Sequence, residues 1–233
     1  MPLPFMLFDP TMLLVLPGLI LAIWAQFKVK SSYARFSKVG TQSGLTGAQV
    51  AQYILQDAGI NAVDIECIPG NLTDHYDPRS RTLRLSQAVY SGNSIAALGI
   101  AAHEVGHAIQ HARMYAPLGI RNIVYPVCSI GSTLAFPLFF AGFFLPVSLG
   151  TTVIQLAILL FSLAVFFTVL TLPVEFNASS RALAALRNGG YLTSDELKGA
   201  RKVLNAAALT YVAGAAMAVL QLIRMVLIAQ SRD

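Results

Sequence analysis

Charged side chains are scarce in this sequence. Asp, Glu, Lys and Arg make up 12% of its 233 residues, whereas hydrophobic residues make up 55%. The mean hydropathy of +0.63 is far above that of an average soluble globular protein. The composition therefore argues against an ordinary soluble domain and predicts a mainly α-helical integral membrane protein.

Cysteines are also few, and the basic residues form no cluster. Cys67 and Cys128 lack the spacing of a C-x-x-C metal site, and Cys128 lies in an apolar run, so we expect two free buried thiols rather than a disulfide. The net charge of +5 comes from scattered basic residues without an aromatic–basic groove pattern. We therefore expect no nucleic-acid partner, because membrane topology explains the positive surplus better.

Long uncharged segments predict four membrane spans. Residues 122–174 contain no Asp, Glu, Lys, Arg or His, and this length holds two helices with a turn at residues 146–150. The first span is followed, not preceded, by basic residues, unlike a signal peptide. The predicted spans are approximately residues 10–27, 122–145, 151–173 and 205–227.

The basic residues are concentrated in the two polar segments between these spans. Residues 28–121 hold nine of the sixteen Lys and Arg residues, and residues 174–204 hold five. The positive-inside rule then predicts that both polar segments are cytoplasmic and both termini lie outside. We expect a multi-pass protein of the cell inner (plasma) membrane, with the lipid bilayer as a partner.

The first polar segment is expected to form a small α+β unit. Its predicted elements are a helix at residues 46–58, a strand at 63–68, and a hairpin of residues 72–76 and 82–85. In the second polar segment, residues 193–196 have the pattern of a capping box. That pattern predicts a helix that continues into the fourth span.

The most informative stretch is His103-Glu104-Val105-Gly106-His107. The apolar run before it, with Ser94 as the expected N-cap, predicts that the stretch is helical. Residues four apart share one face of a helix, so both imidazoles can bind one tetrahedral Zn²⁺. Glu104 is then suited to act as general base towards a zinc-activated water. The alternative is a chance pattern on a polar helix face, which the helical context disfavours.

A catalytic zinc needs a third protein ligand. His111 lies on the same helix face, but about 12 Å of helix rise separates it from His103, so we expect only a polar contact at the helix end. Glu175 is the better candidate, because a carboxylate against an apolar span is costly without a strong partner. Two spans separate it from His107, so both lie on the same side of the membrane. The alternative is an interfacial Glu that begins a helix and is stabilised by its dipole.

Several stretches together resemble the YugP-like bacterial membrane neutral zinc metallopeptidases, which are distantly similar to HtpX and the CAAX proteases. The matching stretches are residues 72–78, 83–86, 101–111, 173–179 and 206–211. The resemblance implies a gluzincin, with one Zn²⁺ per chain bound by His103, His107 and Glu175, and with Glu104 as the base. HtpX-like enzymes usually have an Asp where this chain has Ser179, so that support of a ligand histidine is expected to be weaker or to come from another group.

The resemblance also suggests roles in substrate binding. The strand at residues 82–86, or its partner around His75 and Tyr76, is expected to pair with an extended substrate backbone. His75, Tyr76 and Arg181 are candidates to stabilise the oxyanion. Solvated polar residues of a hairpin or helix are the alternative.

The chain is thus expected to be a single membrane metallopeptidase domain over residues 1–233. Its small zincin-like cytoplasmic unit would carry the motif helix, and its substrate would be a peptide or membrane protein. A non-catalytic, zinc-stabilised scaffold is the first alternative, but it would not need Glu104 as a base. A metal transporter is the second, but residues 122–174 lack the polar ligands that it would need in mid-membrane.

Overall fold

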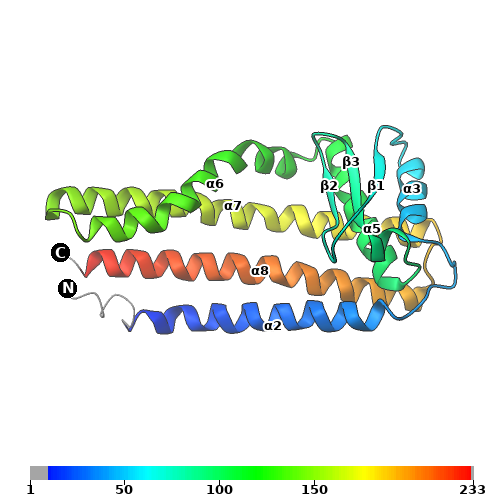
Figure 1. Ribbon diagram of the computed structural model, residues 1–233, viewed down its shortest axis with the longest axis horizontal. Coiled ribbons are helices and arrows are strands. Elements are labelled where there is room, and N and C mark those ends of the chain that lie inside the picture. The colour runs from blue at the N-terminus through cyan, green and yellow to red at the C-terminus, as the bar shows by residue number, and fades with distance from the viewer. Residues whose placement is uncertain (1–9, 232–233) are drawn as a thin grey trace. The chain divides into compact units, whose positions relative to one another are not determined.

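The computed structural model describes residues 10–231 and is mainly helical (Figure 1). Four of its helices are long and apolar enough to cross a membrane. They are α2 (Met12–Phe36), α6 (Ala116–Gly142), α7 (Val147–Asn188) and α8 (Ser194–Gln230). The expectation of four membrane helices and a small sheet is confirmed.

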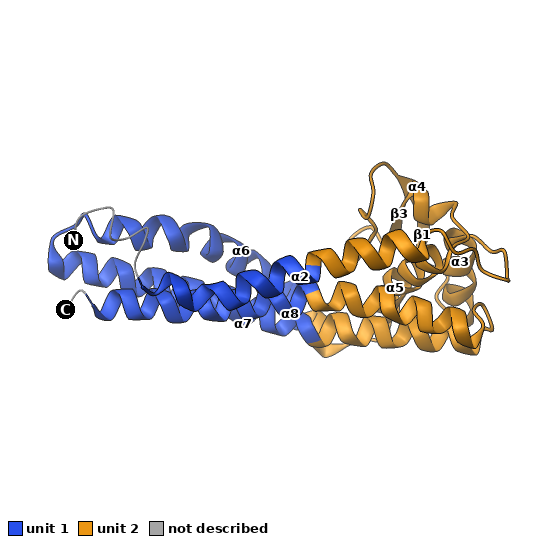
Figure 2. Ribbon diagram, turned by 90° about the horizontal axis from the view of Figure 1, so that it is seen from below, with its two compact units in different colours: residues 1–25, 120–172, 210–233 blue, residues 26–119, 173–209 orange. Residues whose placement is uncertain are grey.

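The described chain divides into two compact units (Figure 2). The first contains residues 10–25, 120–172 and 210–231 and is built only from helices. Its core packs Phe139 of α6, Ile154 and Phe161 of α7, and Met225 of α8. The Phe136 and Phe161 rings meet edge to face with their centroids 5.3 Å apart. Aromatic packing of this kind joins α6 to α7.

The connection between α6 and α7 lies at residues 143–146, so the turn predicted at 146–150 is too late in the sequence. Pro146 precedes the helix, and its carbonyl accepts the Gly150 N–H at 2.7 Å. This hydrogen bond begins α7, because a proline just before a helix initiates it without loss of an internal donor.

The second unit contains residues 26–119 and 173–209 and carries the sheet. The strands β1 (Asp64–Ile68), β2 (His75–Asp77) and β3 (Thr82–Ser86) lie in the order β1-β3-β2. β3 pairs with β1 in parallel and with β2 antiparallel, so the predicted hairpin is confirmed. Its helices are α3 (Gly47–Asp57), the short α4 (Gln87–Tyr90) and α5 (Ile95–Ala112), together with the parts of α2, α6, α7 and α8 that fall within these residues.

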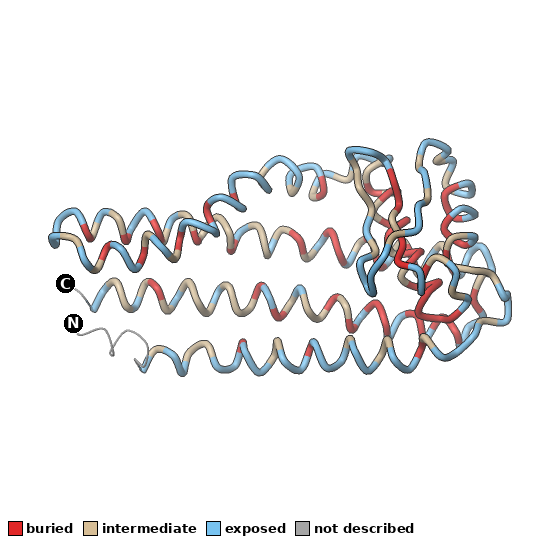
Figure 3. Tube along the Cα trace, in the orientation of Figure 1, coloured by how far each residue is buried: buried red, intermediate tan, exposed pale blue. Residues whose placement is uncertain are grey.

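The core of this unit forms where α3, β3 and α5 pack together (Figure 3). Val50 and Ile54 of α3 meet Leu83 and Leu85 of β3 and Leu98 of α5, and all five are buried. This packing fixes α5 against the sheet. α3 begins with a capping box at Thr46, in which both reciprocal hydrogen bonds are present.

Two predicted helix starts have different outcomes. The capping box at Thr193 is confirmed, because the Glu196 carboxylate accepts the Thr193 backbone N–H at 2.8 Å. The expectation that a span ends at residue 173 and that a new helix begins at Glu175 is wrong, because α7 continues through Pro173 and contains Glu175 in its interior. A proline removes one helical hydrogen bond, but an apolar helix that packs against neighbours tolerates this loss.

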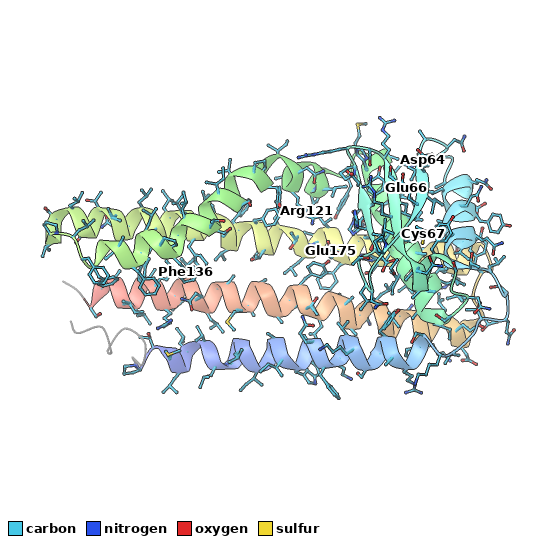
Figure 4. The ribbon with its side chains drawn as sticks, viewed as in Figure 1. Asp64, Glu66, Cys67, Arg121, Phe136 and Glu175 are labelled. Carbon is cyan, nitrogen blue, oxygen red and sulfur yellow. The ribbon has the colours of Figure 1, made fainter. Side chains whose placement is uncertain are left out.

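Both cysteines are free, as predicted, but only Cys128 is buried. Cys67 is exposed on β1 (Figure 4), so the expectation that both thiols are buried is wrong for this residue. Its Sγ donates to the Gln87 side chain at 2.9 Å. The strand is an outer one of the sheet, and one face of an outer strand is open to solvent.

Candidate metal centre

Helix α5 presents the two histidines of the motif. Ser94 caps it, and its hydroxyl accepts the Ala97 N–H at 3.2 Å. His103 and His107 lie one turn apart, and their ring centroids are separated by 4.9 Å. Because the opposite face of α5 is buried in the core through residues such as Leu98 and Val105, the helix cannot rotate and both imidazoles are held on one side.

Glu175, which is labelled on α7 in Figure 4, approaches both imidazoles. Its Oε2 lies 3.4 Å from His103 Nε2 and 3.6 Å from His107 Nε2. Glu175 is buried, with 3% of its surface exposed. The three potential ligand atoms all lie within 4.8 Å of one another. Residues that are distant in sequence thus converge on one point within the second unit.

Gly106 allows α5 and α7 to approach this closely. A Cβ atom at this position would lie 2.5 Å from the Ala178 carbonyl oxygen and 3.1 Å from its Cα. Ala178 itself is fully buried. The contact is between backbones, so neither helix can yield by a side-chain rotation. The glycine between the two histidines therefore sets their distance from Glu175.

The second nitrogen of each imidazole has its own partner. Ser179 Oγ lies 3.1 Å from His103 Nδ1, so this chain's Ser is in contact with a motif histidine. Gln110 Oε1 lies 3.0 Å from His107 Nδ1. Ring orientation is fixed in this way at both histidines, which leaves both Nε2 atoms facing Glu175.

Gln110 was missed by the sequence analysis. It is fully buried, and its Nε2 donates to the Val174 carbonyl at 2.7 Å and to Asn177 Oδ1 at 3.0 Å. Since Nε2 is the donor in both bonds, Oε1 must accept from His107, which therefore carries its proton on Nδ1. The signal was present in the sequence, because Gln110 lies three residues after His107 on the same helix.

The carboxylates give this site a negative potential. Burial disfavours protonation of His107, but the hydrogen bond to Glu175 and the charges of Glu104 and Glu175 outweigh it and raise the pKa of the imidazole. Glu104, next to His103, is itself buried, with 9% of its surface exposed. The site therefore favours a positive charge at the point where the two imidazoles face Glu175.

The other candidate residues contact partners outside the cluster of His103, His107 and Glu175. Arg181 donates from Nε to Asn177 Oδ1 at 2.7 Å, so it joins the network that holds Gln110. The Tyr76 hydroxyl is 2.8 Å from His111 Nδ1, which gives His111 the polar contact expected at the end of α5. His75 is exposed, and its Nδ1 lies 2.8 Å from the Thr73 carbonyl.

The order of the strands corrects one expectation. Residues 82–86 form β3, which is the central strand and is paired on both sides. Its backbone groups are therefore committed, and it cannot accept a substrate strand as proposed from the sequence. β2, which contains His75 and Tyr76, is an outer strand and packs against α5.

The donor set fits zinc. In a tetrahedral site with bonds of 2.0–2.1 Å, neighbouring ligand atoms are about 3.4 Å apart, close to the separations of 3.4 and 3.6 Å from Glu175 to the two imidazoles. Two neutral imidazoles and one carboxylate are also ligands that zinc prefers, and three protein ligands leave a fourth position for water or substrate. Three electron-pair donors would repel one another unless a proton or a metal ion lay between them.

These features define a helical membrane protein in which two half-buried histidines and one buried glutamate form a cluster that suits a zinc ion. The chain belongs to the family described as "Putative neutral zinc metallopeptidase", whose sequence profile matches residues 11–230. It is 50% identical over 215 residues to the "Putative membrane protease YugP" of Bacillus subtilis (strain 168). That alignment covers 92% of this chain and 94% of the relative. No solved structure matches the chain.

Proposed function

We propose that this protein is an integral-membrane zinc endopeptidase of the gluzincin type. The observation that carries the proposal is the convergence of Glu175 on both motif imidazoles, at 3.4 and 3.6 Å. His103, His107 and Glu175 would hold one Zn²⁺ per chain. Membership of the metallopeptidase family supports the same reaction class.

Zinc held by these residues would supply a Lewis acid that activates water and stabilises the developing oxyanion. Glu104 would accept the proton that the water loses as its oxygen forms a bond to the scissile carbonyl carbon. The same carboxyl group would then pass this proton to the amine as the C–N bond breaks. The buried position of Glu104, one residue after His103, suits this role because a non-polar environment strengthens its interaction with the reacting atoms.

Gln110 and Ser179 would keep the imidazoles oriented during this cycle. The Gln110 amide oxygen accepts from His107 Nδ1, and its amide nitrogen donates to the Val174 carbonyl beside Glu175. The same side chain therefore ties a ligand histidine on α5 to the helix that carries the ligand glutamate. Such bonds keep the ligand geometry constant between substrate binding and product release.

We further propose that a peptide substrate pairs with β2. The support is that β2 is an outer strand packed against α5, which carries the motif histidines. Backbone pairing would give affinity that depends little on sequence. Among the three candidates for oxyanion stabilisation, His75, Tyr76 and Arg181, we favour Arg181, because Asn177 holds its guanidinium and Tyr76 is engaged by His111.

Location and partners complete the proposal. Because the two polar segments carry fourteen of the sixteen basic residues, nine and five, the active site would face the cytoplasm from a plasma-membrane protein. The small α+β unit with α5 would then be a zincin-like domain at the membrane surface. The substrates would be peptides or membrane proteins, and no nucleic acid is expected.

The exchange of Glu104 for Gln tests this function. We expect Glu104→Gln to retain about one zinc per chain and to lose cleavage of casein by about 100- to 10,000-fold, because the variant keeps the shape but not the proton acceptor. Metal content and cleavage are measured on the same preparation. Cleavage near the wild-type rate would contradict the general-base assignment, and zinc without cleavage in the wild type would favour a scaffold.

A further inference from the structure

A groove of about 550 Å³ lies within the second unit between α2 and α8. From α2 it is lined by Lys28, Ser31 and Arg35, which are spaced three and four residues apart. From α8 it is lined by Lys202 and Asn205 at the same three-residue spacing. Residues at these spacings share one face of a helix, so each helix turns a polar, basic face towards the groove.

The charges of the lining have one sign. Lys28 and Arg35 from α2 and Lys202 from α8 line the groove, and no Asp or Glu is among its described lining residues. Asn205 adds an amide that can donate hydrogen bonds, whereas the Ser31 hydroxyl donates to the Lys28 carbonyl at 3.1 Å. This combination of several cations with a neutral donor matches the oxygens of a phosphate group.

The groove also lies at the polar end of two apolar segments. In α2, Lys28 follows the uncharged residues 10–27, and in α8 the uncharged residues 203–223 follow Lys202. Both helices therefore change from polar to apolar at the level of the groove, which is where a bilayer holds its headgroups. Leu209, two turns after Lys202 in α8, lines the groove on its apolar side.

The two helices are in contact at the other end of the groove. Phe36 of α2 lies over Gly199 of α8, so close that a Cβ on Gly199 would be 2.9 Å from the Phe36 ring. Phe36 is buried and also lines the groove. The contact keeps the basic faces of α2 and α8 at a fixed separation. A fixed separation suits a ligand of one size, whereas simple attraction of counterions would not require it.

We propose that this groove binds the phosphate of an anionic phospholipid, with its acyl chains along the apolar parts of α2 and α8. Lys28, Arg35 and Lys202 would bind the phosphate oxygens, and Asn205 would donate to the glycerol or phosphate. A soluble phosphate has the same recognition chemistry, but only a lipid also uses the apolar side of the groove at Leu209. Basic pockets beside membrane helices are suited to such headgroups.

The single tryptophan of the chain offers a direct test. Trp24 is one helical turn before Lys28 in α2 and is 49% exposed. The full-length protein is reconstituted in phosphatidylcholine vesicles, and brominated phosphatidylglycerol or brominated phosphatidylcholine is added as a fluorescence quencher. We expect brominated phosphatidylglycerol to quench Trp24 at a severalfold lower mole fraction of the membrane lipid than brominated phosphatidylcholine.

Matched variants separate the groove from general surface charge. Lys28→Gln/Lys202→Gln should weaken the affinity for phosphatidylglycerol by about 30-fold and so abolish the preference for it, since each basic residue near an anionic headgroup contributes a factor of about five in affinity. Lys30→Gln/Arg201→Gln removes the same charge from exposed positions of the same helices that do not line the groove, and it should keep the preference.

Three results would overturn the proposal. The first is equal quenching by the two lipids in the wild type, and the second is an equal loss of the phosphatidylglycerol preference in both double variants. The third is abolition of this preference by millimolar inorganic phosphate, which would assign the groove to a soluble anion. The proposal does not depend on peptidase activity, because the readout requires neither zinc nor a peptide substrate.

Discussion

Glu175 is the residue on which the metal site depends most, because it is the only candidate ligand that α5 does not provide. Its burial would be unfavourable for a charged carboxylate without positive partners. Opposite the two imidazoles, the same burial strengthens its attraction for a cation, because the local dielectric constant is low. A single side chain from α7 therefore adds a third potential ligand to a pair of histidines.

The first prediction at this scale concerns Glu175. Glu175→Ala should lose most of the bound zinc, because two imidazoles alone do not complete a site of this kind. Zinc per chain is measured by elemental analysis after dialysis. His111→Ala is the control and should keep its zinc, since His111 contacts Tyr76 rather than the ligand cluster. Full zinc retention in Glu175→Ala would exclude Glu175 and direct attention to His75 or Asp74.

The second prediction concerns Gln110. Gln110→Met keeps a similar volume but removes the hydrogen bonds to His107 and Val174, and we expect the dissociation constant for zinc to rise about 10- to 100-fold. Competition with a chromophoric chelator measures it without reference to activity. The control is Gln52→Met, at an exposed position of α3. Equal zinc affinity in wild type and Gln110→Met would show that Gln110 only fills space.

Helices α5 and α7 together decide the distances within the site. Their backbones touch at Gly106 and Ala178, and the amide of Gln110 joins them one turn further along α5. Neither helix creates the site alone, because α5 contributes the imidazoles and α7 the carboxylate. The separation of the two helices is thus the variable that sets the ligand geometry.

The prediction at this scale is that Gly106→Val moves α5 away from α7. The added side chain would overlap the Ala178 carbonyl, so we expect a loss of about 1–3 kcal/mol of unfolding free energy and a loss of zinc. Thermal unfolding in detergent and zinc content measure the two effects. Gly119→Val is the control, because a Cβ there would meet nothing within 4 Å. Unchanged zinc affinity in Gly106→Val would show that the helix separation is not limiting.

The hairpin of β2 and β3 has its own electrostatic clamp. Arg84 of β3 donates to Asp77 at 2.8 Å and, with the Arg79 backbone N–H and the Ser80 hydroxyl, holds the pKa of the Asp77 carboxyl well below its usual range. Because the pKa is depressed, the interaction of the Asp77 carboxylate stabilises the fold at any pH above the pKa of Asp77 in the unfolded chain. This stabilisation is lost only as the pH falls towards the pKa of Asp77 in the folded protein. Asp77 is therefore ionised and holds Arg84 at neutral pH.

At the scale of the whole molecule, the distribution of charge governs topology. Basic residues gather in the segments that form the second compact unit, whereas the first unit is almost free of charge. This asymmetry is the physical basis for the proposed orientation, because positively charged loops are retained on the cytoplasmic side.

The prediction at this scale uses the two native thiols. Cys67 is exposed and Cys128 buried, so an impermeant thiol reagent should leave both unmodified in intact cells and modify Cys67 after permeabilisation. A cysteine introduced at Leu149 in a Cys67→Ser background should react in intact cells. Mass shifts on denaturing gels report the labelling. The reverse pattern would invert the orientation and move the active site outside.

Much of this protein followed from local sequence patterns. The uncharged runs gave the membrane helices because the bilayer core penalises each charge, and the capping boxes at Thr46 and Thr193 act within a few residues of themselves. The hairpin and the histidine pair on α5 are equally local. Turn residues determine the hairpin, and the helical repeat places the two histidines on one face. Local patterns were misleading at Pro173, where a helix that packs against its neighbours continued despite the proline.

The sequence by itself predicted four apolar helices and the placement of two imidazoles on one helix face, because these depend on interactions between residues close in the chain. Only the tertiary structure decided that β3 is central, that Gln110 orients His107, and that Glu175 lies within 3.6 Å of both imidazoles. The position of β3 depends on pairing with two other strands, and the two contacts of the site depend on the approach of α5 and α7 at Gly106 and Ala178. All of them arise from packing of segments distant in the chain.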